Sequence, residues 1–417
     1  MGRWEMKTLD ELCEIARGGS PRPIKQFLTD APDGVNWIKI GDATASTKYI
    51  CETKQKIKPE GVTRSRLVHE GDFLLSNSMS FGRPYIMKTS GAIHDGWLVL
   101  SDKSGLFDQD YLYHFLGSDA AYHQFDARAV GSTVRNLNID LVRSVEVPIP
   151  PLPEQKRIVA ILDEAFAAIS TATANAERNL ASGRELFESE LNRVFSEKGD
   201  GWVEKTLGDL VNITHGFAFK GPTFGKSNDE SKPIVLTPGN YAENGTLVFS
   251  DKNTKRLNVP IPEGYLFDVG DLTVVMTDLS SKMKILGKPA FIARPNILHN
   301  QRIGRLCFTD NSVLPRLVFY FLRTKSVSDE IQATATGTMV RHTAPKRILG
   351  NILVMPRERE KQKRVVSRLD DLSCRCDRLE SIYQQKLDAL AELKQSILHK
   401  AFAGELTADH VLAEAGV

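Results

Sequence analysis

Two short motifs in this 417-residue chain come close to catalytic sequences without matching them. A phosphate-binding loop needs four residues between its glycines, followed by Lys and then Ser or Thr. Gly221–Ser227 ends in Lys and Ser but has three residues between its glycines. An amino-methyltransferase needs Asn or Asp, two prolines and an aromatic residue, whereas the Pro-Pro pair here lies between Ile149 and Leu152. Neither motif therefore predicts nucleotide binding or methyl transfer by this chain.

The other residues with catalytic or metal-binding potential are scattered. Asp42, Glu52 and Lys54 have the residue types of a nuclease site, but a chain that is 25% charged produces such sets freely, so a solvated loop is the better interpretation. The histidines occur singly, and the five cysteines have no zinc-finger spacing. We predict that the chain is not an enzyme and has no catalytic residue, no metal site and reduced thiols.

Composition and charge indicate a cytoplasmic protein with two or three domains. No apolar run approaches the roughly 18 residues of a membrane span, and the N-terminus lacks the apolar core of a signal peptide. The formal net charge is +2, and only residues 199–356, with 19 basic and 14 acidic residues, are clearly basic. A protein that grips DNA alone usually carries a broader positive excess. Partners would therefore supply much of any phosphate contact.

The chain contains a tandem duplication. Trp4–Leu12 recurs as Trp202–Leu210 at an offset of 198, and Gln155–Val159 recurs as Gln362–Val366 at an offset of 207. Between them lie four more pairs in the same order: Gly71-Asp72 with Gly270-Asp271, Gly82-Arg83-Pro84 with Gly287-Lys288-Pro289, Ile93-His94-Asp95 with Leu298-His299-Asn300, and Gly131–Arg135 with Gly337–Arg341. Small loop insertions account for the growing offset, and chance does not supply six ordered matches. For the matching histidines we favour a structural role over a base contact.

Each copy begins with a domain of mixed secondary structure. Thr8 with Glu11, and Thr206 with Asp209, predict a capping box at the start of a short helix. Short apolar runs predict β-strands at 35–40, 73–75 and 97–100, matched by 234–236, 272–276 and 303–308. An amphipathic helix is expected over 111–125, matched by 317–331. The predicted fold class is therefore mixed α/β, of the α+β type.

A long helix follows each domain. The first is expected from about residue 157 to 195, after Pro150, Pro151 and Pro153, which suit a helix entry. A seven-residue apolar repeat on both helices predicts that they pair with each other as a coiled coil. Its seam comprises Ile158, Leu162, Ile169 and Leu186 in the first helix, and Val365, Leu369, Leu372, Leu379, Tyr383, Leu390, Leu393 and Ile397 in the second. We predict a domain at 1–150, a spacer helix at 151–198, a second domain at 199–356, and a second spacer helix with a tail at 357–417.

The entry to the first helix carries a family resemblance. Pro151-Leu152-Pro153-Glu154-Gln155-Lys156-Arg157-Ile158, followed by Leu162-Asp163, resembles the sequence that opens the central helix of type I restriction-modification specificity subunits. The second copy keeps Gln-Lys-Arg at Gln362–Arg364 but lacks two of the prolines. Gly18–Pro21 and Gly216–Lys220 are also similar to the target-recognition domains of that family. The resemblance covers nearly the whole chain, and the duplicated layout is the hallmark of the family.

The resemblance implies two target-recognition domains, each reading half of an asymmetric, interrupted DNA site, separated by an antiparallel pair of helices. It also implies two methyltransferase subunits docked on the helices and two motor-nuclease subunits that complete the restriction system. S-adenosylmethionine, ATP and magnesium would serve those partners, so we expect no cofactor on this chain. We expect a non-catalytic DNA-recognition subunit that acts in phage defence.

Loop side chains of Arg, Lys, Asn, Gln and Ser are the usual means of reading DNA bases. The glycine-led loops at 131–135 and 337–341 recur at matching places, where DNA contact and a solvated turn are equally good interpretations. The candidates in the first copy are Arg22, Asn77, Ser78, Arg83, Ser132, Arg135 and Asn136. Those in the second copy are Lys220, Lys226, Lys282, Lys284, Lys288, Thr338, Arg341 and His342.

Two alternative functions belong to other classes of protein. The first is a stand-alone DNA-modifying enzyme, which would show turnover with the purified chain alone. The second is a coiled-coil scaffold without a DNA role, for which the chain and a methyltransferase partner together would retain no duplex.

Overall fold

The computed structural model describes residues 4–44, 48–77, 82–128, 137–197, 199–225 and 229–407. The chain forms two compact units, one made of Met1–Ala176 with Gln385–Val417 and the other of Glu177–Gln384. Each unit contains one mixed domain and a part of each long helix, α7 (Leu152–Ser196) and α12 (Arg359–Ala403). The helices therefore belong to both units, whereas each domain belongs to one.

The first domain contains two five-stranded sheets. The sheet β2-β11-β8-β9-β5 is antiparallel except for the pair β9–β5, and the sheet β3-β6-β4-β10-β7 is antiparallel except for β4–β10. Strand β1 pairs with β12, so the two ends of the domain meet. The strands are β1 Glu5–Thr8, β2 Cys13–Arg17, β3 Leu28–Thr29, β4 Val35–Ile38, β5 Tyr49–Ile50, β6 Lys56–Ile57, β7 Arg66–Val68, β8 Phe73–Ser76, β9 Pro84–Met87, β10 Gly91–Ile93, β11 Trp97–Asp102 and β12 Glu146–Ile149. The helices are α1 Leu9–Leu12, α2 Ile40–Thr44, α3 Pro59–Val62, α4 Gln109–Leu116, α5 Asp119–Arg128 and α6 Ile139–Arg143, with a 3-10 turn at Ile24–Gln26.

The second domain repeats this plan with shorter sheets. Its sheets have the orders β14-β22-β18-β20 and β15-β17-β16-β21, with two-stranded ribbons β13-β24 and β19-β23. The strands are β13 Trp202–Thr206, β14 Val211–His215, β15 Phe224–Gly225, β16 Ile234–Val235, β17 Arg256–Leu257, β18 Leu272–Val275, β19 Thr277–Asp278, β20 Pro289–Phe291, β21 Ile297–Leu298, β22 Ile303–Phe308, β23 Arg341–His342 and β24 Ile352–Pro356. The helices are α8 Leu207–Leu210, α9 Pro315–Arg323, α10 Lys325–Ala333 and α11 Pro345–Leu349, with 3-10 turns at Gly221–Thr223 and Pro238–Asn240.

The duplicated sequence produces duplicated local structure. Both predicted capping boxes are confirmed: the Thr8 and Thr206 hydroxyls accept hydrogen bonds from the backbone N–H of Glu11 and Asp209, and each carboxylate bonds back to its threonine N–H. The predicted strands are also present, at β4, β8 and β11 and at β16, β18 and β22. The mixed α/β class is thus confirmed for both copies.

The single helix predicted in each domain was wrong, because both copies divide it in two. In the first copy α4 ends at Leu116 and is capped by Gly117, and the Ser118 hydroxyl donates a hydrogen bond to the Phe115 carbonyl. In the second copy the break is at Thr324, whose backbone is extended (φ −61°, ψ 148°) and whose hydroxyl bonds the Phe321 carbonyl. A Ser or Thr that bonds nearby backbone competes with the helical ladder, and this determines both breaks.

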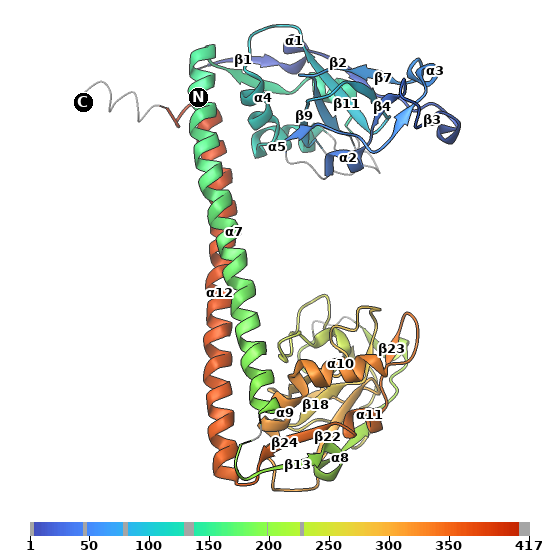
Figure 1. Ribbon diagram of the computed structural model, residues 1–417, viewed down its shortest axis with the longest axis vertical. Helices are drawn as coiled ribbons and strands as arrows, with labels where there is room; N and C mark the ends of the chain where they lie inside the picture. The colour runs from blue at the N-terminus through green and yellow to red at the C-terminus, as the bar shows by residue number, and fades with distance from the viewer. Residues whose placement is uncertain are drawn as a thin grey trace, which may run out of the picture. The chain divides into compact units, whose positions relative to one another are not determined.

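Helices α7 and α12 pack against each other as an antiparallel coiled coil, and Figure 1 shows them side by side. In the first unit, Ile158 and Leu162 of α7 share a buried cluster with Leu398 and Ala401 near the end of α12. In the second unit, Arg184 Nε lies 2.9 Å from Glu380 Oε1 of α12. The start of α7 meets the end of α12 and the reverse, so the predicted antiparallel pairing is confirmed.

Three leucines of the predicted seam are exposed. Leu186 is 59% exposed, and Leu379 and Leu393 are 43% and 47% exposed, whereas Phe187 is 7% exposed. A strict seven-residue count drifts by about 20° per heptad around a helix of 3.6 residues per turn. Leu186 lies four heptads after Ile158, so the buried position has moved one residue along, from Leu186 to Phe187. Leu393 is the counterpart of Leu186 at the 207-residue offset and is exposed as well.

The other predicted seam residues are buried or half-buried. Ile158, Leu162 and Leu369 are fully buried. The half-buried members are Ile169, Val365, Leu372, Tyr383, Leu390 and Ile397.

Among the described helices, α7 alone is long and apolar enough to cross a membrane by length and composition, which is weak evidence for a single helix. Its apolar stretch includes Ile158 and Leu162, which are fully buried against protein. The carboxylate of Asp163 lies 3.0 Å from the His114 ring nitrogen of the first domain. These are the contacts of a helix packed on a protein domain.

Candidate nucleic-acid interface

In the second domain the structure joins the two loops that carry most of the predicted DNA contacts. Strands β19 and β23 pair antiparallel, with Thr277 opposite His342 and Asp278 opposite Arg341. The Thr277 hydroxyl lies 3.0 Å from His342 Nδ1. Two backbone hydrogen bonds between Thr336 and His342 close the turn that carries Thr338. Residues separated by about 60 positions in sequence thus form one ribbon, which we call the β19–β23 ribbon.

Asp278 fixes the shape of the loop that follows β19. Its carboxylate is 3% exposed and accepts hydrogen bonds from the backbone N–H of Ser280 (2.7 Å) and of Ile285 (3.1 Å). The loop between these anchors carries the exposed Lys282 and Lys284. Lys284 Nζ lies 2.8 Å from Glu243 Oε1, an exposed pair that solvent screens strongly. Both lysines can therefore turn toward a phosphate at little cost.

Arg341 has the clearest unfilled hydrogen-bonding capacity on the ribbon. Among the described residues, its Nε and the Thr343 hydroxyl are two of the buried side-chain polar atoms without a hydrogen-bond partner. A buried donor without a partner is costly, and an acceptor on a ligand would relieve that cost. Arginine is also the residue that most often reads guanine in the major groove.

Apolar side chains project from the same ribbon. Met339 is 79% exposed and Leu279 is 55% exposed. Gly337 shapes the turn with φ +93°, and a Cβ there would lie 2.1 Å from the Val340 carbonyl oxygen, so only glycine fits. Exposed apolar groups beside cations match a surface that contacts thymine methyl groups and phosphates together.

The other two lysines predicted in the second copy lie elsewhere. Lys220 is exposed in the loop before Gly221–Thr223, where its carbonyl accepts two hydrogen bonds from Thr223. Lys288 is half-buried, and burial lowers the pKa of its ammonium group. It lines a cavity of about 550 Å³ with Arg323 and Phe187. Lys226 lies outside the described residues.

Three of the predicted contacts in the first copy are described by the structure. Arg22 is largely exposed and lies 3.6 Å from Asp95. Arg83 is exposed and sits over the Tyr85 ring, 5.3 Å from its centroid. Asn77 is only 2% exposed, and its amide donates to the Asp95 carbonyl at 2.8 Å, so its present contacts are with its own domain. The remaining candidates, Ser78, Ser132, Arg135 and Asn136, lie outside the described residues.

The glycine motifs that suggested the family resemblance have a packing role. A Cβ on Gly18 would lie 2.1 Å from the His94 carbonyl oxygen, and one on Gly216 would lie 2.4 Å from that of His299. Each glycine therefore permits the same close backbone approach in its copy. His299 is buried, its Nε2 lies 2.8 Å from the Ile303 carbonyl, and burial lowers its pKa. These contacts agree with the structural role favoured for the two histidines.

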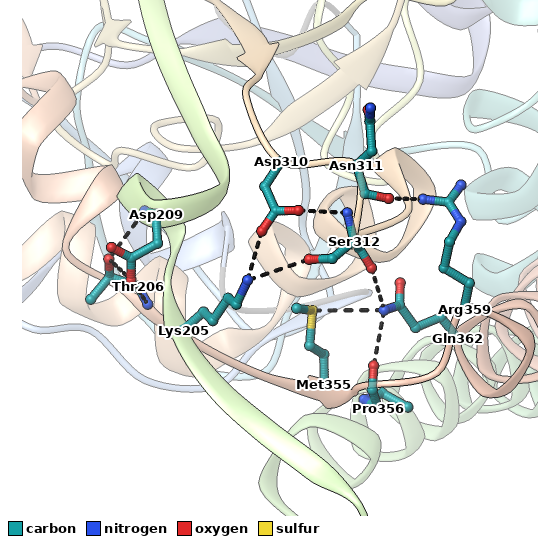
Figure 2. A network of polar contacts seen from close by, with 10 residues as sticks. All are labelled: Lys205, Thr206, Asp209, Asp310, Asn311, Ser312, Met355, Pro356, Arg359 and Gln362. Carbon is teal, nitrogen blue, oxygen red and sulfur yellow. Dashed lines mark hydrogen bonds and ion pairs between the residues drawn. The ribbon is translucent and has the colours of Figure 1, made fainter.

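A buried glutamine, which the sequence showed only as part of a repeated Gln-Lys-Arg, joins each domain to its long helix. Figure 2 shows it in the second copy: Gln362 Nε2 donates to the carbonyls of Ser312 (2.8 Å) and Pro356 (2.9 Å). Gln362 Oε1 accepts from the Leu314 N–H at 3.0 Å. Nearby, Lys205 Nζ lies 2.6 Å from a carboxylate oxygen of Asp310. Hydrogen bonds to that carboxylate, the one from Lys205 contributing most, lower the pKa of Asp310 to about 2. The network ties β13, the loop before α9 and α12 together.

Gln155 makes the same three bonds in the first copy. Its Nε2 donates to the carbonyls of Leu106 (2.9 Å) and Pro150 (2.8 Å), and its Oε1 accepts from the Asp108 N–H at 2.7 Å. Both glutamines are 0% exposed. We call each set of three bonds a glutamine joint. The repeat at an offset of 207 was the sequence signal for these residues, but it did not reveal their contacts.

Comparison with known proteins places this architecture. The family model described as "Type I restriction modification DNA specificity domain" matches residues 1–178. The MjaVIII specificity subunit of Methanocaldococcus jannaschii is 23% identical over 97% of this chain and 93% of its own length. The EcoKI specificity subunit of Escherichia coli is 22% identical over 72% of this chain and 66% of its own. A putative specificity subunit of Haemophilus influenzae is 31% identical over 39% of this chain and 42% of its own.

Solved structures share the fold over the whole chain. A chain from a study of "complex assembly and conformational transition of the type I R-M system" matches 97% of this chain and 98% of its own length, with 18% identity and a TM-score of 0.78. The HsdS subunit from Thermoanaerobacter tengcongensis matches 97% of both chains, with 18% identity and a TM-score of 0.55. With its two duplicated domains and paired long helices, this chain is similar, over nearly its whole length, to the specificity subunits of type I restriction-modification enzymes.

Proposed function

We propose that this chain reads an asymmetric, bipartite DNA site, one half with each domain, and presents its long helices to two methyltransferase subunits and two motor-nuclease subunits. The observation that carries the proposal is the duplication: two domains of the same plan differ in their loop residues, and each is joined to its helix in the same way. Two different readers on one scaffold fit a non-palindromic site, while two similar helix entries fit two copies of the same partner.

The β19–β23 ribbon is the reader proposed for the second domain. Arg341 lies on the ribbon itself, Met339 on the turn that leads into β23, and Lys282 and Lys284 on the loop that follows β19. Arginine and apolar contacts to bases, combined with lysine contacts to phosphates, are the combination that direct readout uses. In the first domain, the corresponding reader would be formed by the segments that carry Asn77, Ser78 and Arg135.

We also propose that the chemistry belongs to the partners. S-adenosylmethionine would serve the methyltransferase subunits, and ATP and magnesium would serve the motor-nuclease subunits, with no cofactor held by this chain. The assembly would act in the cytoplasm, where bacterial and archaeal DNA is found.

DNA binding by the chain with and without its methyltransferase partner tests the proposal. The first copy, residues 1–150, has 18 basic and 19 acidic residues, so the chain alone should bind duplex weakly and with little specificity. Adding the methyltransferase should tighten binding and select a sequence from a random duplex pool. A complex that retains no duplex at any salt concentration would favour the scaffold alternative and overturn the proposal.

A further inference from the structure

We propose that Gln155 and Gln362 are positioning residues that set the spacer length accepted between the two half-sites, an inference that rests on the proposed function. Each glutamine occupies the fourth position of its helix, counting from Leu152 in α7 and from Arg359 in α12. Each glutamine connects three parts of its copy: the end of the last strand of the domain (β12 or β24), the loop before α4 or α9, and the long helix that carries the glutamine. The glutamine joint is thus the place where the direction of the helix relative to its domain is fixed.

The chemistry of the joint accepts a primary amide and excludes its near relatives. The side chain must donate two hydrogen bonds to carbonyls and accept one from an N–H, all without solvent. Glutamate has no donor and would place a charge against two carbonyl oxygens. Leucine has a similar size but leaves two carbonyls and one N–H unpaired. The joint therefore specifies an amide by geometry and by polarity.

A second contact between domain and helix recurs at the same offsets, but the domain residue that makes it changes type between the copies. In the first copy His114 lies 3.0 Å from Asp163 of α7. In the second copy Tyr320 and Arg316 both bond Asp370 of α12. Of these two repeated contacts, the glutamine joint keeps both the same side chain on the helix and the same three backbone partner groups, at the 206- and 207-residue offsets. Because both copies have the same joint, the joint fits a role that both domains need, and two domains that read different sequences both need a fixed placement on the helices.

A rigid joint matters because a small tilt at the helix becomes a larger displacement on the far side of the domain. A domain of about 150 residues has a radius of gyration of about 15 Å and is therefore about 38 Å across. A tilt of about 5° at one side moves a loop on the far side by about 3.4 Å, which is one base-pair step. A complex that distinguishes spacers differing by one pair must hold each domain within a few degrees of its helix. A glutamine with all three bonds satisfied limits that tilt.

The experiment measures methylation by the complete complex on duplexes that carry both half-sites at spacers from two pairs shorter to two pairs longer than the natural one. Gln155→Leu and Gln362→Leu are compared with Gln124→Leu. Gln124 exchanges two 2.9 Å hydrogen bonds with the Glu146 backbone, within the first domain. This control removes amide hydrogen bonds to backbone at a half-buried position that is not on a long helix. Gln155→Asn, which keeps the amide on a shorter side chain, serves if the leucine variants do not fold.

The expected result is a loss of discrimination between the natural spacer and its neighbours, with unchanged half-site sequences, in the Gln155 and Gln362 variants but not in the Gln124 variant. An equal fall in methylation at every spacer would mean that the glutamines only stabilise the fold, and unchanged profiles would mean that they do not limit the tilt. Either result overturns the inference. If the wild-type complex methylates no bipartite site, the proposed function fails instead.

Discussion

Arg341 differs from the other candidate contacts because its surroundings leave it unsatisfied. Lys284 already has a carboxylate partner, and Asn77 is buried in its own domain. Arg341 is half-buried on a hydrogen-bonded ribbon, so its guanidinium is partly ordered before any ligand arrives. A preordered side chain loses less conformational entropy on binding, and this favours specific readout over loose phosphate contact.

Replacing Arg341 with alanine should therefore relax recognition at one position of the second half-site. The expected loss is about 1–3 kcal/mol of discrimination, the range for one arginine that reads a base. Arg347→Ala removes an exposed arginine from α11 of the same domain and serves as the matched control. Methylation of single-base variants of the site, at limiting complex, gives the comparison. If the Arg341 variant and the parent had identical base preferences, Arg341 would belong to a solvated turn and would not read a base.

His299 makes the stability of the second domain depend on pH. Burial holds its pKa below the ordinary value of 6.5, so the unfolded chain takes up a proton at a higher pH than the folded one does. The free energy of unfolding should thus fall as pH drops through about 6.5 toward the lower folded-state pKa. Urea unfolding at pH 7.5 and 5.5 should show a smaller fall for His299→Gln than for wild type. The exposed His399→Gln should keep the full fall, and equal losses in all three proteins would contradict the assignment.

Residue types and spacing predicted some of these roles but not others. The sequence motifs singled out the glycines at 18, 216 and 337, and the structure gives the reason: a Cβ at any of these positions would clash with backbone atoms. Gln155 and Gln362 were visible only as repeats, since an amide that bonds backbone carbonyls has no pattern of neighbours to mark it. Which side chain lies next to Arg341 depended on the pairing of β19 with β23, which sequence spacing does not encode.

At the scale of elements, the heptad count predicted the buried residues correctly at the start of α7 but not near its end, where Phe187 is buried in place of Leu186. The capping boxes are local and were predicted correctly from four residues each. The seam is a property of two helices packed on a domain, and in the second unit that packing draws Phe187 inward. Its ring lies 6.4 Å from that of Tyr320 and 4.7 Å from the Arg323 guanidinium. The domain, as well as the partner helix, thus decides which residue is buried.

This difference predicts opposite results for two adjacent residues. Phe187→Ala should lower the free energy of unfolding by about 3–5 kcal/mol, because it removes a buried ring and leaves a cavity. Leu186→Ala should change it by no more than about 0.5 kcal/mol, since the side chain is mostly exposed. Urea unfolding of the isolated chain measures both values. If Leu186→Ala lowered the free energy of unfolding more than Phe187→Ala did, the strict seven-residue seam would be correct after all.

At the scale of the whole molecule, most of the correct predictions came from the sequence duplication. Six ordered repeats were enough to predict two similar domains and two long helices, because each copy had to fold in the same way. The antiparallel direction of the helices came from the family resemblance. The division of α7 and α12 between the two compact units was not predicted, since it depends on how each helix end packs into the core of a domain. The DNA sequence that each domain is proposed to read would also depend on loop conformation, which the repeats leave free.

Sequencing of genomic methylation tests the central claim, that two independent readers on this chain direct a methyltransferase to a bipartite site. Three otherwise identical hosts are compared: one without the gene, one with it, and one with a hybrid in which residues 1–150 come from another specificity subunit. The account predicts no such methylation without the gene, a bipartite motif with it, and a hybrid motif that changes in one half and keeps the other half. Methylation that does not depend on the gene, or a hybrid motif altered in both halves, would contradict the account.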